Sequence, residues 1–262
     1  MINLGAQLYT VRSFLTTVED VKSTFSKVRE IGYEYVQLSG LKNFKDEEII
    51  NCVKAEAERL GLKIIVTHIP YSLLAEDFDY VVQMHHKLNC PYVGLGAINP
   101  EVRNNPSAEQ YIEYAKTIDG FAHKLKEHDL KLVYHNHEFE FARCGEKTYY
   151  DLLVENTTEI QFEVDVFWVH KGGRSPEKLL LSLKDRLDII HLKDYVVYHD
   201  GSNLRSEIRY GWIGEGNLDF KEIIASAEKA NCKYMFVEQD DCYGENPFSC
   251  LEKSYNYVKG LK

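Results

Sequence analysis

The chain has 262 residues, and its 41 acidic and 31 basic side chains give a formal net charge of −10 at neutral pH. Binding to DNA or RNA depends on a basic face, so this balance argues against a nucleic-acid-binding protein. The residues are 44% hydrophobic and include 18 Tyr and 12 Phe, which excludes a disordered chain. The length is about that of one (β/α)8 barrel.

The amino-terminal segment and the cysteines indicate the cellular compartment. Residues 1–9 lack the cationic stretch and the long apolar run of a signal peptide. No apolar run approaches the roughly 20 residues of a membrane-spanning helix. The 6 cysteines form no C-x-x-C pair, which favours free thiols over a zinc ribbon or a redox pair. We therefore expect a cytoplasmic protein that does not associate with a membrane.

Short β-branched or aromatic runs alternate with longer stretches of helical periodicity along the whole chain. Strands are expected at residues 4–9, 35–38, 63–68, 92–95, 131–135, 160–165, 188–192 and 233–238. Helices are expected at residues 18–31, 46–60, 76–88, 108–128, 148–155, 176–186, 218–229 and 247–259. Capping residues before Pro176 and Pro247, and Gly32 and Gly61 after the first two helices, agree with these boundaries.

This alternation predicts an α/β fold in which every strand is parallel to the next, because right-handed crossovers return each strand in the same direction. Eight such units close into a (β/α)8 TIM barrel, here a single domain over residues 1–262. An open doubly wound sheet is the alternative, but its first turn usually carries a glycine-rich phosphate loop, whereas residues 10–13 contain no glycine. A barrel places its chemistry at the carboxyl ends of the strands.

Ionisable residues gather at the ends of the four neighbouring strands five to eight, and one histidine follows strand three. They are His68; His135, His137, Glu138 and Glu140; Asp165; His191, Lys193 and Asp194; and Glu238, Asp240 and Asp241. Buried like charges repel one another unless a cation or a substrate compensates them. The pattern therefore predicts a compensating cation at this rim of the barrel.

One divalent metal ion is the simplest such cation. Carboxylate and imidazole donors without thiolates favour Mn²⁺, Mg²⁺, Co²⁺, Fe²⁺ or Zn²⁺. A site of three carboxylates and one histidine would leave positions open for two adjacent oxygens of a hydroxy ketone. Chelation of such a substrate makes the intervening carbon more acidic, and carboxylates can then remove and return its proton.

Five segments, together with the opening residues 7–12, carry a resemblance that covers essentially the whole chain. The segments are residues 134–141, 163–168, 190–194, 214–220 and 237–240. In this order the chain resembles the sugar phosphate isomerase and epimerase family, which belongs to the xylose isomerase-like TIM barrels.

The resemblance implies one divalent metal held by acids from strands five, six and eight and by a histidine from strand seven. By position, the ligands of strands six to eight are Asp165, His191 and Glu238. In relatives that epimerise ketoses, the glutamates of strands five and eight also transfer the proton, which makes Glu238 a catalytic residue as well.

Strand five departs from the family pattern, because it reads His135-Asn136-His137 where many relatives place a glutamate. We expect Glu140 to be the replacement ligand and the second catalytic glutamate, because a subset of relatives with H-N-H-x-x-E-F shares it. A ring nitrogen of His135 or His137 is the alternative ligand. A histidine near the substrate, or Lys193, is the alternative second proton carrier.

The substrate-binding residues expected at this rim are His68, His135, His137, Trp168 and Lys193. Each has a structural alternative: His68 as a hydrogen-bonded barrel histidine, Trp168 as a core residue, and Lys193 as a surface lysine paired with Asp194.

The predicted function is that of a metal-dependent isomerase or epimerase of a keto sugar, sugar phosphate or related polyol, with a proton abstracted beside a metal-chelated carbonyl. The alternative is a metal-dependent lyase or dehydratase resembling inosose dehydratase on the same site.

Apurinic endonucleases need many zinc-binding histidines and a DNA-binding face, which the net negative charge opposes. A glycosidase barrel commonly needs an acid after strand four, which ends in residues 94–97 without one. A non-catalytic binding barrel leaves the clustered charges unexplained. The partner is expected to be a small molecule, and association into a homo-oligomer stays open.

Overall fold

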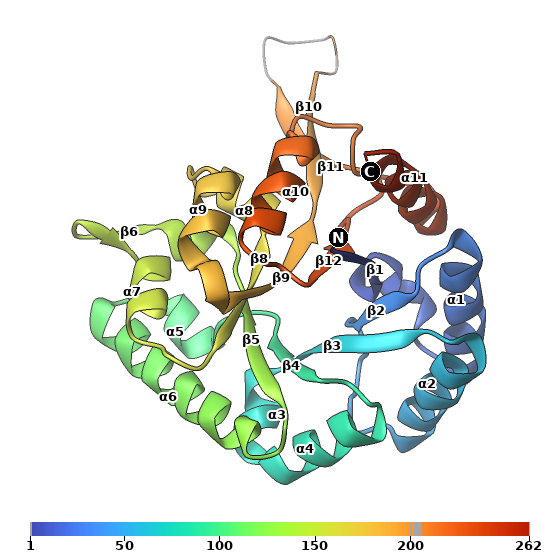
Figure 1. Ribbon diagram of the computed structural model, residues 1–262, viewed down its shortest axis with the longest axis horizontal. Helices are drawn as coiled ribbons and strands as arrows, with labels where there is room; N and C mark the ends of the chain where they lie inside the picture. Colours follow the sequence, from blue (N-terminus) through green and yellow to red (C-terminus); the bar gives the residue numbers. More distant parts are fainter. Residues whose placement is uncertain (1, 200, 202–205, 262) are drawn as a thin grey trace.

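Eight parallel strands close into a barrel in the computed structural model, which describes residues 2–199, 201 and 206–261 (Figure 1). Around the barrel the order is β1-β12-β9-β8-β5-β4-β3-β2, and closure is visible at Gly5, which pairs with Tyr35 of β2 and Phe236 of β12. The predicted (β/α)8 fold is confirmed. The strands are β1 (Asn3–Gln7), β2 (Tyr35–Leu38), β3 (Lys63–Ile69), β4 (Tyr92–Leu95), β5 (Lys131–His135), β8 (Gln161–Asp165), β9 (Leu187–Leu192) and β12 (Tyr234–Val237).

Helices surround the barrel, and shorter elements fill the loops at its carboxyl-terminal rim. The outer helices are α1 (Val18–Ile31), α2 (Glu47–Leu60), α4 (Phe78–Lys87), α6 (Ala108–Lys126), α7 (Tyr149–Glu155), α9 (Pro176–Leu183), α10 (Phe220–Lys229) and α11 (Pro247–Gly260). The loop elements are η1 (Leu8–Phe14), α3 (Tyr71–Glu76), α5 (Pro100–Asn104), η2 (Glu138–Phe141), α8 (Val166–Lys171) and η3 (Lys184–Arg186). Among the described residues, none of these helices has the length and apolar character needed to cross a membrane.

Two small antiparallel pairs complete the structure. One joins β6 (Arg143–Cys144) to β7 (Lys147–Thr148), and the other joins β10 (Asp194–Tyr198) to β11 (Glu207–Gly211). The β10–β11 hairpin extends away from the barrel in Figure 1. Neither pair was expected from the sequence.

Local capping explains where the helices begin and end. Thr17 and Asp20 form a capping box at the start of α1, and Gly32, in the left-handed region at φ 116°, ends it. The helix expected at residues 76–88 is α4, which begins at Phe78 because Asp77 has a non-helical backbone, and the short helix α3 before it was not expected. The helix expected at residues 176–186 ends early, because Lys184 has a positive φ of 45°.

The barrel interior is filled by side chains, so the space for a substrate lies above it. A cluster of Ile65, Val66, Tyr92, Val133, Ile189 and Phe236 packs inside the barrel. At Gly5 a Cβ atom would lie 2.4 Å from the Phe236 ring, so only glycine leaves room for this packing. Polar residues at the carboxyl ends of the strands stand on this apolar floor.

Candidate metal and substrate site

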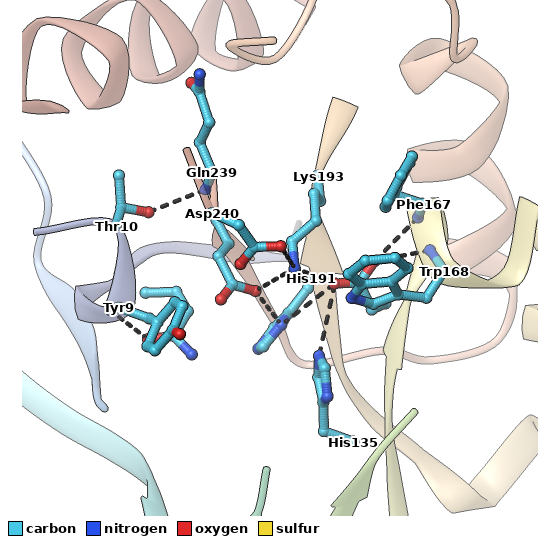
Figure 2. A network of polar contacts seen from close by, with 12 residues as sticks. Tyr9, Thr10, His135, Phe167, Trp168, His191, Lys193, Gln239 and Asp240 are labelled. Atoms are coloured by element: carbon cyan, nitrogen blue, oxygen red, sulfur yellow. Dashed lines mark hydrogen bonds and ion pairs between the residues drawn. The ribbon is translucent and has the colours of Figure 1, made fainter. Parts of the chain in front are cut away.

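Four buried side chains meet at the carboxyl ends of β5, β8, β9 and β12. They belong to His135, Asp165, His191 and Glu238, and one donor atom of each lies within 4.8 Å of those of the others. Nδ1 of His191 is 2.9 Å from Oε2 of Glu238 and 3.8 Å from Oδ2 of Asp165. Nε2 of His135 is 3.5 Å from Oδ2 of Asp165. Figure 2 shows His135 and His191 turned toward a common centre.

The local sequence determines how Asp165 presents its carboxylate. Oδ1 accepts hydrogen bonds from the backbone N–H groups of Phe167 and Trp168, which caps α8. The side chain of Asn136 accepts the backbone N–H of Asp165, which ties the end of β5 to that of β8. The capping bonds leave Oδ2 of Asp165 free to face the cluster.

The donor atoms of the cluster make ion-pair contacts with one another and with Lys193, but several have no hydrogen bond of ordinary geometry within the described part of the chain. The buried atoms without such a hydrogen bond are both ring nitrogens of His135, Nδ1 of His191, Oδ2 of Asp165 and Oε2 of Glu238. Buried polar atoms normally make hydrogen bonds, so a convergent set held only by ion-pair contacts is suited to accept a ligand. Two carboxylates and two imidazoles are a donor set that divalent first-row metals accept. The residues present therefore fit a divalent metal ion.

Lys193 supplies a buried positive charge beside this set. Its Nζ lies 3.0 Å from Oδ2 of Asp165, 3.1 Å from Oε2 of Glu238 and 3.0 Å from Oδ2 of Asp240. Burial alone would lower the pKa of Lys193, but these carboxylates outweigh it and hold that pKa well above its ordinary value. The alternative of a surface lysine paired with Asp194 is wrong, because Lys193 is buried and the Asp194 carboxylate accepts backbone N–H groups of residues 195, 214, 216 and 218.

Electrostatics fix the charge state of each donor in the metal-free protein. Burial opposes ionisation of Asp165 and Glu238, yet the Lys193 ammonium outweighs it and holds both carboxyl pKa values well below the ordinary range. Burial lowers the pKa of His135 to about 4, so its ring is neutral and free to act as a donor. Burial also opposes protonation of His191, but nearby carboxylates raise its pKa well above the ordinary value. A metal ion would have to displace that proton.

The structure does not bring Glu140 into the cluster. Oε1 of Glu140 accepts the Tyr134 hydroxyl at 2.6 Å, and Oε2 accepts the backbone N–H of His137 at 2.8 Å. The side chain is fully buried, and burial raises its pKa to about 8. The 3-10 helix η2 turns Glu140 back to cap its own first turn. His135, the alternative that the sequence left open for strand five, lies in the cluster instead.

A cavity of about 350 Å³ opens above the cluster. Its lining includes four of the expected substrate-binding residues, and it is completed by residues from several loops: His68, His135, His137, Lys193, Glu238, Asp240, Gln7, Tyr9, Arg12, Ser39, Gly96, Ala97, Arg103 and Tyr210. Trp168 is not part of the lining. Its buried ring packs against His137, with ring centroids 5.5 Å apart, and beneath Lys193.

Glu163 is a site residue that the sequence did not single out. It is fully buried, it hydrogen bonds to Nε2 of His68, and its Oε1 lies 3.1 Å from Nε2 of His191. The side chain of Gln37 also contacts Nε2 of His191 at 2.7 Å. The signal was present in the sequence, since Glu163 precedes Asp165 by two residues and side chains two apart on a strand share a face.

Asp240, which follows Glu238 by two residues, is the second site residue outside the expected set. It lines the cavity, and burial raises its pKa to about 6.

Three comparisons with known proteins agree with this fold. A family model described as Xylose isomerase-like TIM barrel matches residues 25–249. The chain is 24% identical over 266 residues to an inosose dehydratase of Geobacillus kaustophilus (strain HTA426), covering 90% of this chain and 85% of that protein.

Among solved structures, a sugar phosphate isomerase/epimerase from Parabacteroides distasonis ATCC 8503 superposes with a TM-score of 0.80 at 21% identity, covering 99% of this chain and 98% of that one. An L-ribulose 3-epimerase superposes with a TM-score of 0.72 at 13% identity, covering 100% and 94%. At these identities the solved structures support the fold.

Proposed function

The chain belongs to the xylose isomerase-like TIM barrel family, and from that premise we propose that it is a divalent-metal-dependent isomerase or epimerase of a keto sugar, sugar phosphate or related polyol. The observation that carries the proposal is the convergence of buried carboxylate and imidazole donors, several without a hydrogen bond of ordinary geometry, from four neighbouring strands at the floor of a cavity.

His135, Asp165, His191 and Glu238 would hold one metal ion. When bound, a divalent ion polarises a substrate carbonyl and thereby increases the acidity of the neighbouring C–H bond. The donor set admits Mn²⁺, Mg²⁺, Co²⁺, Fe²⁺ and Zn²⁺. Glu163 and Gln37 would orient His191 through its other ring nitrogen, as outer partners of metal-binding histidines do.

Glu238 is the proposed base. Its carboxylate lines the cavity, so it is placed to accept a proton from the carbon beside the carbonyl. Lys193 lines the same cavity and can donate a hydrogen bond to the substrate oxygen on which negative charge develops.

Epimerisation also requires a group that returns the proton from the other side. Glu140 does not line the cavity, so we assign this role to His68, whose ring reaches the cavity from β3, three strands around the barrel from β12. Glu163 holds Nε2 of His68 and leaves Nδ1 beside the side chain of Gln7. Proton transfer at Nδ1 of His68 requires the side chain of Gln7, 3.5 Å away, to give way to the substrate.

A dehydratase is the second candidate, because the inosose dehydratase relative covers most of the chain. Elimination begins with the same proton abstraction by Glu238. It then needs an acid for the departing hydroxyl, and His68 is placed to supply that proton. The two candidates share one site and differ in the fate of the intermediate.

The experiment that tests the proposal is incubation of metal-loaded protein in deuterium oxide with a panel of ketoses, ketose phosphates and inososes. We expect deuterium to enter the carbon beside the carbonyl of at least one compound, as followed by NMR. Epimerisation then leaves the mass unchanged apart from deuterium, whereas elimination lowers it by one water. Absence of exchange across the panel, with metal bound, would contradict the proposal.

Two predictions from the sequence stay predictions: a cytoplasmic location, and a small-molecule partner rather than nucleic acid or a membrane. Association into a homo-oligomer stays open. Light scattering of the purified protein tests for such association.

A further inference from the structure

A second cavity opens beside the one above the metal cluster. We call it the side chamber; its volume is about 610 Å³. Both cavities are lined by Tyr9, Ser39, His68, Gly96 and Ala97, so they adjoin each other at these residues. The residues that line the side chamber alone are Gly40, Leu41, Phe44, Ile69, Pro70, Tyr71, Ser72, Ile98, Asn99, Pro100 and Glu101.

Gly96 lies where the two cavities join. A Cβ atom at this position would lie 2.8 Å from Nδ1 and 2.9 Å from Cγ of His68. The backbone of Gly96 is not in the left-handed region, so its conformation alone does not require glycine. Glycine is instead needed for the close approach of His68, which stands between the metal cluster and the side chamber.

The two cavities differ in chemistry. The cavity above the metal cluster carries Lys193, Glu238, Asp240 and two arginines, whereas the side chamber is lined mainly by apolar and aromatic side chains. Of the residues that line the side chamber alone, the one charged residue is the exposed Glu101. The residues that line the side chamber alone thus offer no cation to a phosphate. They also offer few hydrogen-bond partners to sugar hydroxyls, and burying a hydroxyl without such a partner is unfavourable.

From this division we propose that the substrate is a keto sugar with an aromatic substituent, whose sugar end lies at the metal cluster and whose ring lies in the side chamber. The inference rests on the proposed function for the sugar end. Phe44 and Tyr71 provide aromatic surface for the substituent, and its burial there stabilises the complex through the hydrophobic effect. A ligand spanning both cavities has its polar and apolar parts matched to the residues around each.

The test uses three probes that each carry a ketone, measured with the metal-loaded protein by isothermal titration calorimetry: the 3-keto derivatives of phenyl β-D-glucopyranoside and of methyl β-D-glucopyranoside, and fructose 6-phosphate. We expect the phenyl ketoglucoside to bind roughly tenfold more tightly than the methyl ketoglucoside. Equal or undetectable binding of the two ketoglucosides overturns the inference, and so does tightest binding of the phosphate.

A variant that fills the side chamber locates the effect. Ser72 is exposed, lines the side chamber and lies outside the metal cluster. We expect Ser72→Trp to remove the preference for the phenyl ketoglucoside and to leave binding of the methyl ketoglucoside unchanged. Thr117→Trp, on the outer face of α6, is the matched control and is expected to retain the preference. A preference that survives Ser72→Trp contradicts the side-chamber assignment.

These binding measurements do not depend on turnover, so they separate the two claims. A phenyl preference without deuterium exchange supports the side chamber and counts against the proposed function. Deuterium exchange without a phenyl preference supports the proposed function and counts against the side-chamber assignment.

Discussion

Nζ of Lys193 lies 3.1 Å from Oε2 of Glu238, so a buried ammonium stands beside the carboxylate assigned as both ligand and base. The same ammonium contacts Asp165 and Asp240. In the metal-free protein Lys193 therefore balances charge that a metal ion would otherwise balance. Figure 2 shows the side chains of Lys193, His191 and Asp240 close to one another.

The first prediction concerns Lys193→Met. Loss of the ammonium leaves buried carboxylates unpaired, and breaking such a pair costs about 3–5 kcal/mol of stability. We expect a lower melting temperature for the chelator-treated variant, tighter metal binding because the competing cation is gone, and weaker activity. Calorimetric metal titration and thermal unfolding measure these effects. Lys171→Met, which removes an exposed lysine paired with Glu138, is the control and should change little. A parallel loss of metal affinity in Lys193→Met would contradict this account.

The second prediction compares Glu238→Gln with Glu140→Gln, two matched changes on different strands. We expect Glu238→Gln to lose metal affinity by at least about tenfold and to slow deuterium exchange by about 10²–10⁴-fold. Glu140→Gln should keep the metal, because both Glu140 oxygens serve Tyr134 and the backbone of His137. Its effect should be a loss of stability of about 1–3 kcal/mol. Elemental analysis measures the metal content of both variants, and urea unfolding measures their stability. Loss of metal from Glu140→Gln would support the expectation from the sequence that Glu140 is a metal ligand.

The third prediction concerns Glu163, a positioning residue for His191 and His68. Glu163→Gln removes the charge that holds Nε2 of both rings and should lower metal affinity by about 10–100-fold. The histidine NMR spectrum should also change its tautomer pattern, which a loss of packing alone would not produce. Unchanged affinity with unchanged histidine signals would mean that Glu163 only fills space.

The fourth prediction concerns pH and stability at the opposite end of the barrel. Asp188 accepts hydrogen bonds from Tyr92, Lys131 and Lys233. Burial raises its pKa, but these donors outweigh burial and hold the pKa below 3.8. Because the folded-state pKa is the lower one, the stabilisation is full above the unfolded value and is lost as pH falls through the folded value. Urea unfolding should show Asp188→Asn to be less stable than wild type at pH 7, with a gap that narrows near pH 3. A gap independent of pH would refute this role.

Much of the fold was predictable because one pattern repeats along the chain. The α1 helix begins and ends at the predicted residues, since Thr17 and Gly32 mark both ends in the sequence. The hairpin of β10 and β11 was missed, because its residues were interpreted as the loop after strand seven.

The site was predictable where a side chain's direction follows from strand alternation. Asp165, His191 and Glu238 converge for that reason. Glu140 does not join them, because its direction depends on η2, a turn of four residues whose geometry the sequence pattern does not reveal. The burial of Lys193 depends on three carboxylates from other segments, which no local pattern contains.

Titration of a divalent metal into chelator-stripped protein tests the central claim most directly. We predict one site per chain in the wild type, and binding weakened by at least about tenfold in His135→Ala. The contrary result is the absence of stoichiometric binding to the wild type, or binding that His135→Ala leaves unchanged.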